Sequence, residues 1–174
     1  ELVQRVLDEM MAEGLQLVVL GAGDPQQEDI FRDAARRYPG RIAVHIGYDD
    51  TLARRIYAGA DVLLMPSQKQ PCGISQLIAM RYGCIPLVRE IGGLVDTVET
   101  FNPETYEGTG FSFTNYNAHD MLHVIKLACT IYQDKKRWTQ LMKSAMKADH
   151  SWKTSAKEYV SLYSRIIKED FYVS

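Results

Sequence analysis

The sequence has no excess of charge of one sign and no long apolar run. Its 20 lysines and arginines are balanced by 22 aspartates and glutamates, and the formal net charge is -2. The basic surface that nucleic-acid binding requires is therefore missing. No apolar stretch approaches the ~18 residues that a membrane-spanning helix needs. Both absences argue against nucleic acid and membrane as partners.

Cysteine is also sparse, and histidine shows no metal-binding pattern. The three cysteines, Cys72, Cys84 and Cys129, are an odd number at wide spacing. This spacing favours reduced thiols in a cytoplasm over a disulfide framework or a zinc site. His119 and His123 lie one helical turn apart, but no third ligand is evident. We therefore expect a cytoplasmic protein with no metal and no other cofactor.

Apolar periodicity indicates an α/β fold with a doubly wound parallel sheet, because strand-like and helix-like segments alternate along the chain. With 174 residues, of which 46% are apolar, the chain is long enough for one sizeable core. We expect residues 1–174 to form a single domain. The predicted strands are 15–20, 41–46, 60–65, 84–89 and 110–113, and the helices between them are 25–37, 51–58, 73–82 and a short one after Gly93.

Both ends of the sequence carry amphipathic patterns. The chain opens at Glu1 inside such a pattern, from which we expect a fragment of a longer protein. Three amphipathic helices are predicted at the other end. The last of them carries the regular aromatic stripe Trp152, Tyr159 and Tyr163. A regular aromatic stripe is usually part of a core, so we expect this helix to dock on the sheet.

The candidate ligand site lies in the stretch 66–98. Here an apolar strand ends, and a helical period begins at Gly73. The first amides of that helix, near Ile74, Ser75 and Gln76, have no acceptors within the helix, and glycine lets a ligand approach the backbone closely. Because ligands bind at the carboxyl ends of strands in open α/β sheets, this position suits an anion such as a phosphate.

The same stretch resembles the hallmark segment of bacterial glycogen synthases and plant starch synthases. Residues 71–98, PCGISQLIAMRYGCIPLVREIGGLVDTV, follow the family pattern P-C-G-L-x-Q-L-x-A-M-R-Y-G-x-x-P-x-V-R-x-T-G-G-L-x-D-T-V. The resemblance implies the GT-B architecture, which has two Rossmann-like domains with the active site in the cleft between them. This chain resembles the C-terminal, nucleotide-sugar-binding half. In the family the terminal helix runs back towards the N-terminal domain, so the resemblance implies that part of the apolar face of this helix is bare here. The likeness extends to LVVLGAGD at 17–24, HIGYDD at 45–50, GADVLLMPS at 59–67, GTGFSF at 108–113 and SWKTSAKEYVSLY at 151–163.

The resemblance implies a retaining glucosyltransferase that moves glucose from ADP-glucose to the non-reducing end of an α-1,4-glucan. The partners it implies are ADP-glucose and the glucan, and we expect the glucan to bind an N-terminal domain that lies outside this sequence. The donor-binding residues that the resemblance implies are Gly47, Tyr48, Cys72, Gly73, Ile74, Ser75, Gly92 and Gly93.

These residues have different implied roles. Gly47 and Tyr48 line the adenine pocket in the family, where a tyrosine ring can stack on the base. The backbone of Cys72 lies beside the donor sugar, although its apolar neighbourhood taken alone predicts a buried thiol. The amides of residues 73–75 hold the distal phosphate, and residues 92–93 let a ligand approach the backbone.

The largest departure from the family pattern is Gln70, at the position of a glutamate thought to contact the donor glucose and stabilise positive charge at the anomeric carbon. An amide keeps the hydrogen-bonding shape but removes the negative charge. Lys69 stands where phenylalanine is frequent, and Ile91 where a threonine or serine is usual. Two explanations of Gln70 stay open: a variant with weakened chemistry, or a homologue that tolerates glutamine because other groups carry the charge. The competing hypothesis for the function is a nucleotide-sugar-binding or regulatory domain without transfer activity.

Two elements that the resemblance implies have no match in this sequence. One is the S-R-x-x-x-Q-K-G segment, whose arginine and lysine grip the diphosphate, and the other is a strand central to the usual sheet order; both would precede Glu1. We therefore expect either direct pairing of the strands at 15–20 and 60–65 or an exposed strand edge between them.

Overall fold

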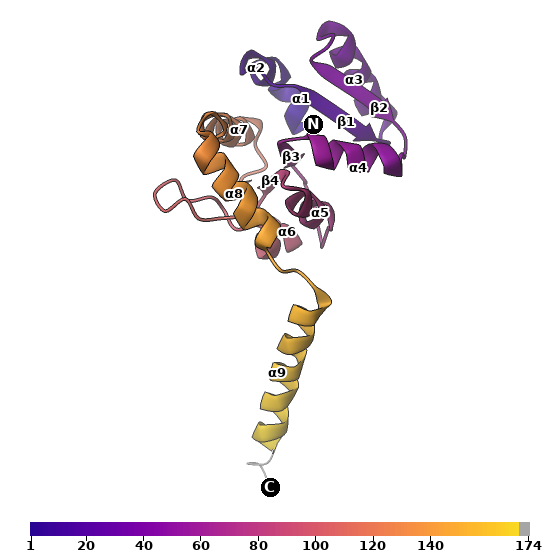
Figure 1. Ribbon diagram of the computed structural model, residues 1–174. Helices are drawn as coiled ribbons and strands as arrows, with labels where there is room; N and C mark the ends of the chain where they lie inside the picture. Colours follow the sequence, from indigo (N-terminus) through magenta and orange to yellow (C-terminus); the bar gives the residue numbers. More distant parts are fainter. Residues whose placement is uncertain (171–174) are drawn as a thin grey trace.

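In the computed structural model, which describes residues 1–170 and their side chains as far as Ile167, parallel strands alternate with helices (Figure 1). The α/β class is therefore confirmed, and the elements differ from the predicted ranges by one or two residues at their ends. The strands are β1 Leu17–Gly21, β2 Ile42–Ile46, β3 Val62–Met65, β4 Ile85–Arg89 and β5 Phe111–Phe113. The helices are α1 Leu2–Arg5, α2 Leu7–Ala12, α3 Pro25–Arg37, α4 Asp50–Gly59, α5 Ser75–Tyr82, α6 Gly93–Thr97, α7 Ala118–Gln133, α8 Lys135–Lys147 and α9 Trp152–Asp170.

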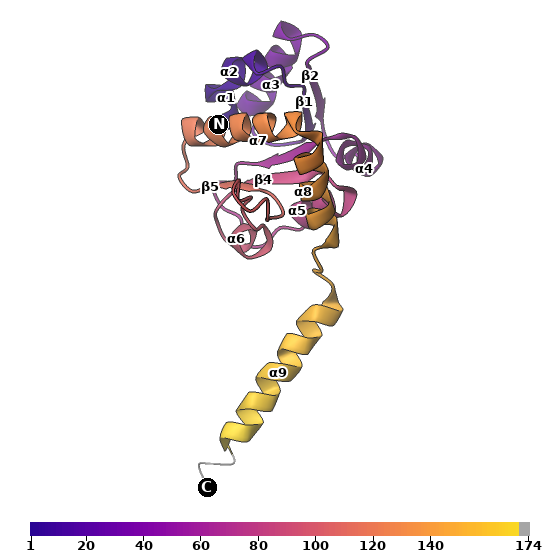
Figure 2. The same ribbon diagram turned by 60° about the vertical axis from the view of Figure 1, so that its left-hand side comes forward.

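The strands form two separate parallel sheets. β1 pairs with β2, and β4 lies between β3 and β5. The central strand β4 is the most deeply buried, with Ile85 and Leu87 fully covered. Helix α7 packs against α1 and α2 as well as against β4 and β5, so it connects the two sheets (Figure 2).

A cavity of about 1000 Å³ separates the two sheets. Strand β1 lines one side with Leu17–Leu20, strand β3 lines the other with Val62–Leu64, and Ile125 and Cys129 of α7 also line it. No ladder joins β1 to β3. Of the two expectations for this region, direct strand pairing is therefore wrong and the exposed edge is confirmed.

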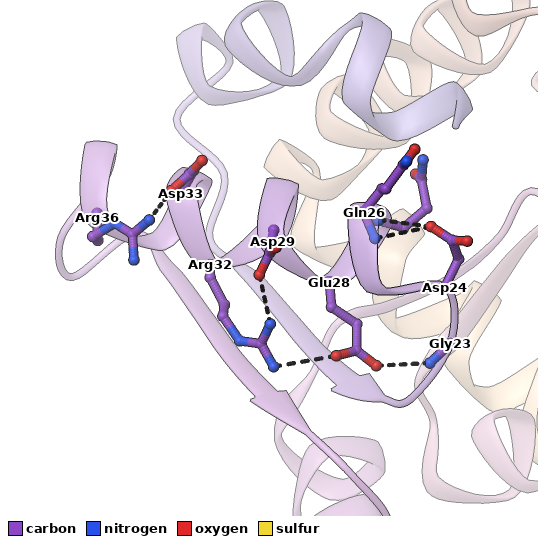
Figure 3. Close-up of polar contacts among 9 residues, drawn as sticks. Gly23, Asp24, Gln26, Glu28, Asp29, Arg32, Asp33 and Arg36 are labelled. Carbon is purple, nitrogen blue, oxygen red and sulfur yellow. Dashed lines mark hydrogen bonds and ion pairs between the residues drawn. The ribbon is translucent and has the colours of Figure 1, made fainter.

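Local hydrogen bonds fix the turn between β1 and α3 (Figure 3). The carboxylate of Asp24 accepts hydrogen bonds from the amides of Gln26 and Gln27, and Pro25 occupies the first helical position. The carboxylate of Glu28 accepts a hydrogen bond from the amide of Gly23 at 3.0 Å and pairs with Arg32. This arrangement is a well-capped helix start, because aspartate is a favoured N-cap residue and proline is favoured at the first helical position.

The aromatic part of the core joins α7, α8 and β5. Trp138, 4% exposed, stacks on Phe111 with ring centroids 6.3 Å apart and forms a T-shaped pair with Tyr132 with centroids 5.1 Å apart. Phe101, from the loop before β5, completes the group against Phe111. These contacts anchor the first two of the three expected C-terminal helices to the sheet.

The third, α9, extends away from the rest of the molecule (Figures 1 and 2). Trp152 is 86% exposed, and Tyr159 and Tyr163 are exposed and contact each other. The prediction that this aromatic stripe docks on the sheet is therefore wrong. The carboxylate of Asp149 accepts hydrogen bonds from the Ser151 amide and the Thr154 hydroxyl at the start of α9, which lowers its pKa to about 2. Within residues 1–170, no helix is long and apolar enough to cross a membrane.

The two tryptophans provide a direct test of this arrangement. Trp138→Ala should cost about 3 to 5 kcal/mol of unfolding free energy, because it leaves a cavity in the core. Trp152→Ala should change it by less than about 0.5 kcal/mol, because the ring is exposed. Urea unfolding of this chain followed by circular dichroism measures both. Equal losses would show that α9 packs on the domain.

The open edges of β1 and β3 generate a second prediction. Unpaired edges recruit further strands, so this chain, produced alone, should self-associate with rising concentration. Val18→Lys, which places a charge on β1 at the cavity, should reduce that association. Val95→Lys, at a site of similar exposure on α6 (57% against 51%), should not. Sedimentation velocity distinguishes the variants, and a concentration-independent monomer of the unmodified chain would refute the prediction.

Candidate functional site

Two loops meet at the carboxyl edge of the three-stranded sheet, one after β3 and one after β4. A Cβ atom added to Gly92 would overlap the carbonyl oxygen of Gln70, and one added to Gly93 would lie 2.8 Å from the carbonyl oxygen of Cys72. Gly92 also has a φ of 52°, which favours glycine. The Gly92–Gly93 turn therefore rests directly on the backbone of the loop that leads into α5.

The N-terminus of α5 has no side-chain cap. Gly73, with a φ of 82°, turns the chain towards the helix, Ile74 is the N-cap, and the helix begins at Ser75. The predicted start at Gly73 is wrong by two residues, because a left-handed φ lies outside helical geometry. The first amides of the helix, including those of Ser75 and Gln76, point towards the loop end and suit an anion.

A buried glutamine connects the two loops. Gln76 is 0% exposed, and its Nε2 donates to the Gly73 carbonyl at 3.0 Å and to the Thr97 hydroxyl at 3.1 Å. The Thr97 hydroxyl in turn donates to the Gly93 carbonyl at 2.7 Å. Neither side chain was among the predicted site residues. The available signal was a polar residue among the apolar residues of the helix.

Arg89, at the end of β4, holds the start of the β3–α5 loop. Its Nη1 donates to the carbonyls of Ser67 and Gln68 at 3.2 and 3.1 Å, and its Nε donates to the carbonyl of Thr114 at 3.3 Å. The guanidinium also lies over the ring of Tyr116. Arg89 is therefore a structural residue that fixes the approach to Gln70.

The cysteines have different surroundings. Cys72 is exposed, so the buried thiol that its apolar neighbourhood predicts is wrong; its loop lies on the surface at the sheet edge. Cys84, just after the C-cap of α5, is buried, and burial, with a smaller contribution from Asp61, raises the pKa of its thiol to about 12. Burial, followed by the charge of Glu13, also raises the pKa of Cys129. Cys72 is thus the accessible thiol of the three.

The predicted adenine-binding pair follows β2, in the other sheet. The amide of Gly47 donates to the carbonyl of Gly21 at 2.9 Å, which fixes the ends of β1 and β2 together. The ring of Tyr48 is 99% exposed, just before α4. Helix α4 packs on α5, where the rings of Tyr57 and Tyr82 stack at 6.2 Å.

The structure thus brings part of the predicted site together. Gln70, Cys72, Gly73, Gly92 and Gly93 lie in contact through their loops. Ile74 and Ser75 start the adjoining helix. No hydrogen bond or ring contact within residues 1–167 joins Tyr48 to these loops, so its role stays a prediction. Over the same residues, no three His, Cys, Asp or Glu side chains gather as a metal site would require.

The chain resembles known proteins over most of its length. It is 53% identical to a glycogen synthase from Geobacillus thermodenitrificans over 170 residues, and 52% identical to one from Geobacillus stearothermophilus. These matches cover 98% of this chain but only 35% of each relative, so the chain spans about a third of the length of the curated relatives it matches.

A solved structure agrees with this similarity. The catalytic domain of Starch Synthase IV from Arabidopsis thaliana, bound to ADP and acarbose, matches 94% of this chain with a TM-score of 0.83 at 31% identity, and the match covers 35% of that chain. The family model described as glycosyl transferases group 1 matches residues 1–144. Strands β1–β5, helices α1–α7 and both glycine-containing loops of the candidate site lie within those residues, and the chain belongs to the glycosyl transferases group 1 family.

Proposed function

We propose that this chain is the donor-binding domain of a retaining glucosyltransferase, which moves glucose from ADP-glucose to the non-reducing end of an α-1,4-glucan. The observation that carries the proposal is the backbone contact between the Gly92–Gly93 turn and the Gln70–Cys72 loop beside the N-terminus of α5. The names of the relatives and the ADP in the starch synthase structure support this choice of donor and product.

In this proposal, the amides of residues 73–75 bind the distal phosphate of the donor. The positive end of the α5 dipole would stabilise the negative charge that the leaving diphosphate gains. Glycine at 92 and 93 would let the donor approach the backbone without a side chain in the way. The reaction as proposed uses no metal or other cofactor, and Tyr48 would stack on the adenine.

The acceptor glucan requires a second part of the protein. The proposed reaction must deliver an acceptor hydroxyl from across a cleft, and this domain offers only the donor side. We assign glucan binding to an N-terminal domain in the longer protein, and the exposed apolar face of α9 is available to pack on it. A cytoplasmic location, suggested by the three free thiols, is part of the same proposal.

Gln70 and Ile91 favour one alternative, a nucleotide-sugar-binding or regulatory domain without transfer activity. At these positions the chain lacks the carboxylate and the hydroxyl that the family pattern carries. Radiolabelled transfer to glycogen by the full-length protein, with ADP-glucose and UDP-glucose compared as donors, decides between the two. Transfer supports the enzyme, whereas donor binding without transfer supports the alternative.

The adenine contact is testable at Tyr48. Tyr48→Ala in the full-length protein should weaken ADP binding by about 1 kcal/mol or more, the scale of an aromatic stacking contact. Tyr48→Phe retains the ring and should bind nearly as well as the unmodified protein. Isothermal titration calorimetry with ADP measures both variants. Unchanged affinity in Tyr48→Ala removes this residue from the site.

The missing carboxylate is testable at Gln70. Gln70→Glu should raise kcat, because a carboxylate stabilises the positive charge that develops at the anomeric carbon, and each ~1.4 kcal/mol gained is about tenfold in rate. The donor Kd should change less than kcat, because this charge is largest in the transition state. Transfer assays of both proteins side by side give the comparison. If the unmodified full-length protein already transfers glucose rapidly and Gln70→Glu is no faster, another residue stabilises the positive charge at the anomeric carbon.

A further inference from the structure

The side chain of Gln76 is completely buried, yet its amide oxygen accepts no hydrogen bond from the described residues. Its Oε1 is the single buried side-chain nitrogen or oxygen atom without a partner in the described part of the chain. Burying an acceptor without a donor is unfavourable, and such atoms usually find a partner. Helix α5 nevertheless has this side chain at its second position, directly behind the candidate site.

The other end of the same amide makes two hydrogen bonds that cross between segments. Nε2 contacts the Gly73 carbonyl in the β3–α5 loop and the Thr97 hydroxyl at the end of α6. The Thr97 hydroxyl in turn donates a hydrogen bond to the carbonyl of Gly93. A chain of three hydrogen bonds thus links the glycine before α5 to the glycine that opens α6, parallel to the backbone contact between the same two loops.

The unmet Oε1 lies close to a possible donor. A Cβ atom built on Gly73 would lie 3.1 Å from Gln76 Oε1 and would collide with Nε2 of Gln70. The amide nitrogen of Gln70 and the side-chain oxygen of Gln76 therefore both lie close to the same point beside Gly73. An amide at position 70 can donate a hydrogen bond to this acceptor, whereas a carboxylate there could not, so Gln70→Glu gives up this hydrogen bond while it supplies the negative charge beside the anomeric carbon.

We propose that Gln76 and Thr97 are positioning residues that hold the two glycine-containing loops as one unit, with Gln76 Oε1 accepting a hydrogen bond from the Gln70 amide when the nucleotide sugar binds. The Gln70 amide then stays oriented towards the donor sugar while α5 and α6 keep a fixed spacing. The second part of this inference rests on the function proposed above. The coupling of the two loops does not.

The coupling is tested without ligand by amide hydrogen exchange in the full-length protein. Thr97→Val removes the hydroxyl at nearly constant shape, and exchange should rise by about three- to tenfold in both segments, 70–78 and 92–98, the range expected for one lost hydrogen bond. Thr97→Ser retains the hydroxyl and should keep both segments near their original rates. Gln76→Met should reproduce Thr97→Val if it folds.

The matched control is Thr130→Val. The Thr130 hydroxyl also donates to the carbonyl four residues earlier in its helix, that of Lys126, but it joins no second segment. The Thr130→Val variant should leave amide hydrogen exchange in both loops unchanged. If Thr97→Val raises exchange only in its own segment, 92–98, the two loops are independent and the proposal is wrong.

The link to Gln70 is tested by comparing two ligands. In Thr97→Val, affinity for ADP-glucose should fall by about three- to tenfold more than affinity for ADP, because Gln70 faces the sugar and not the nucleotide. Equal losses of affinity for ADP-glucose and ADP would overturn the proposed hydrogen bond between Gln70 and Gln76. If the unmodified protein binds no ADP-glucose, the proposed function and the link to Gln70 fail together, while the exchange experiment still decides whether the loops are coupled.

Discussion

The candidate site depends on one close contact, that between the Gly92–Gly93 turn and the backbone of the Gln70–Cys72 loop. Side chains at positions 92 and 93 would push the loops apart, so glycine is required at both. The contact places a helix N-terminus, an exposed thiol and a half-buried amide around one surface. Chemistry at this site would come mainly from backbone amides, which are fixed before any ligand arrives.

The strands and helices of the domain hold the two loops of this contact in place. Strand β4 leads into the glycine turn, and Arg89 at its end also holds the loop from β3. Helix α7 connects the two sheets across the cavity, so the separate β1–β2 unit remains attached although no ladder joins it to β3. The positions of Gly47 and Tyr48 relative to the loops after β3 and β4 therefore depend on helix packing, because no strand pairing links the two sheets.

Much of this organisation could be predicted from the sequence. The alternation of strands and helices follows from local periodicity, and the glycines of the site follow from a long motif match. Gln76 and Thr97 could not be found in this way, because burial of a glutamine depends on which loops close over it, and composition alone favours the surface for this residue type. The periodicity also failed to predict the outward course of α9, since an aromatic stripe shows that a helix has an apolar face but does not identify the surface that covers it; only the family resemblance implied that part of this face is bare.

Protection of Cys72 by ligand is the most direct test of a donor site at this contact. Iodoacetamide alkylation of the full-length protein, followed by mass spectrometry, reports Cys72 and Cys84 together, and Cys84 serves as an internal control because burial raises its pKa to about 12 and keeps it unreactive. The account predicts that saturating ADP-glucose slows alkylation of Cys72 and leaves Cys84 unchanged. Alkylation of Cys72 at the same rate with and without bound ADP-glucose would contradict it.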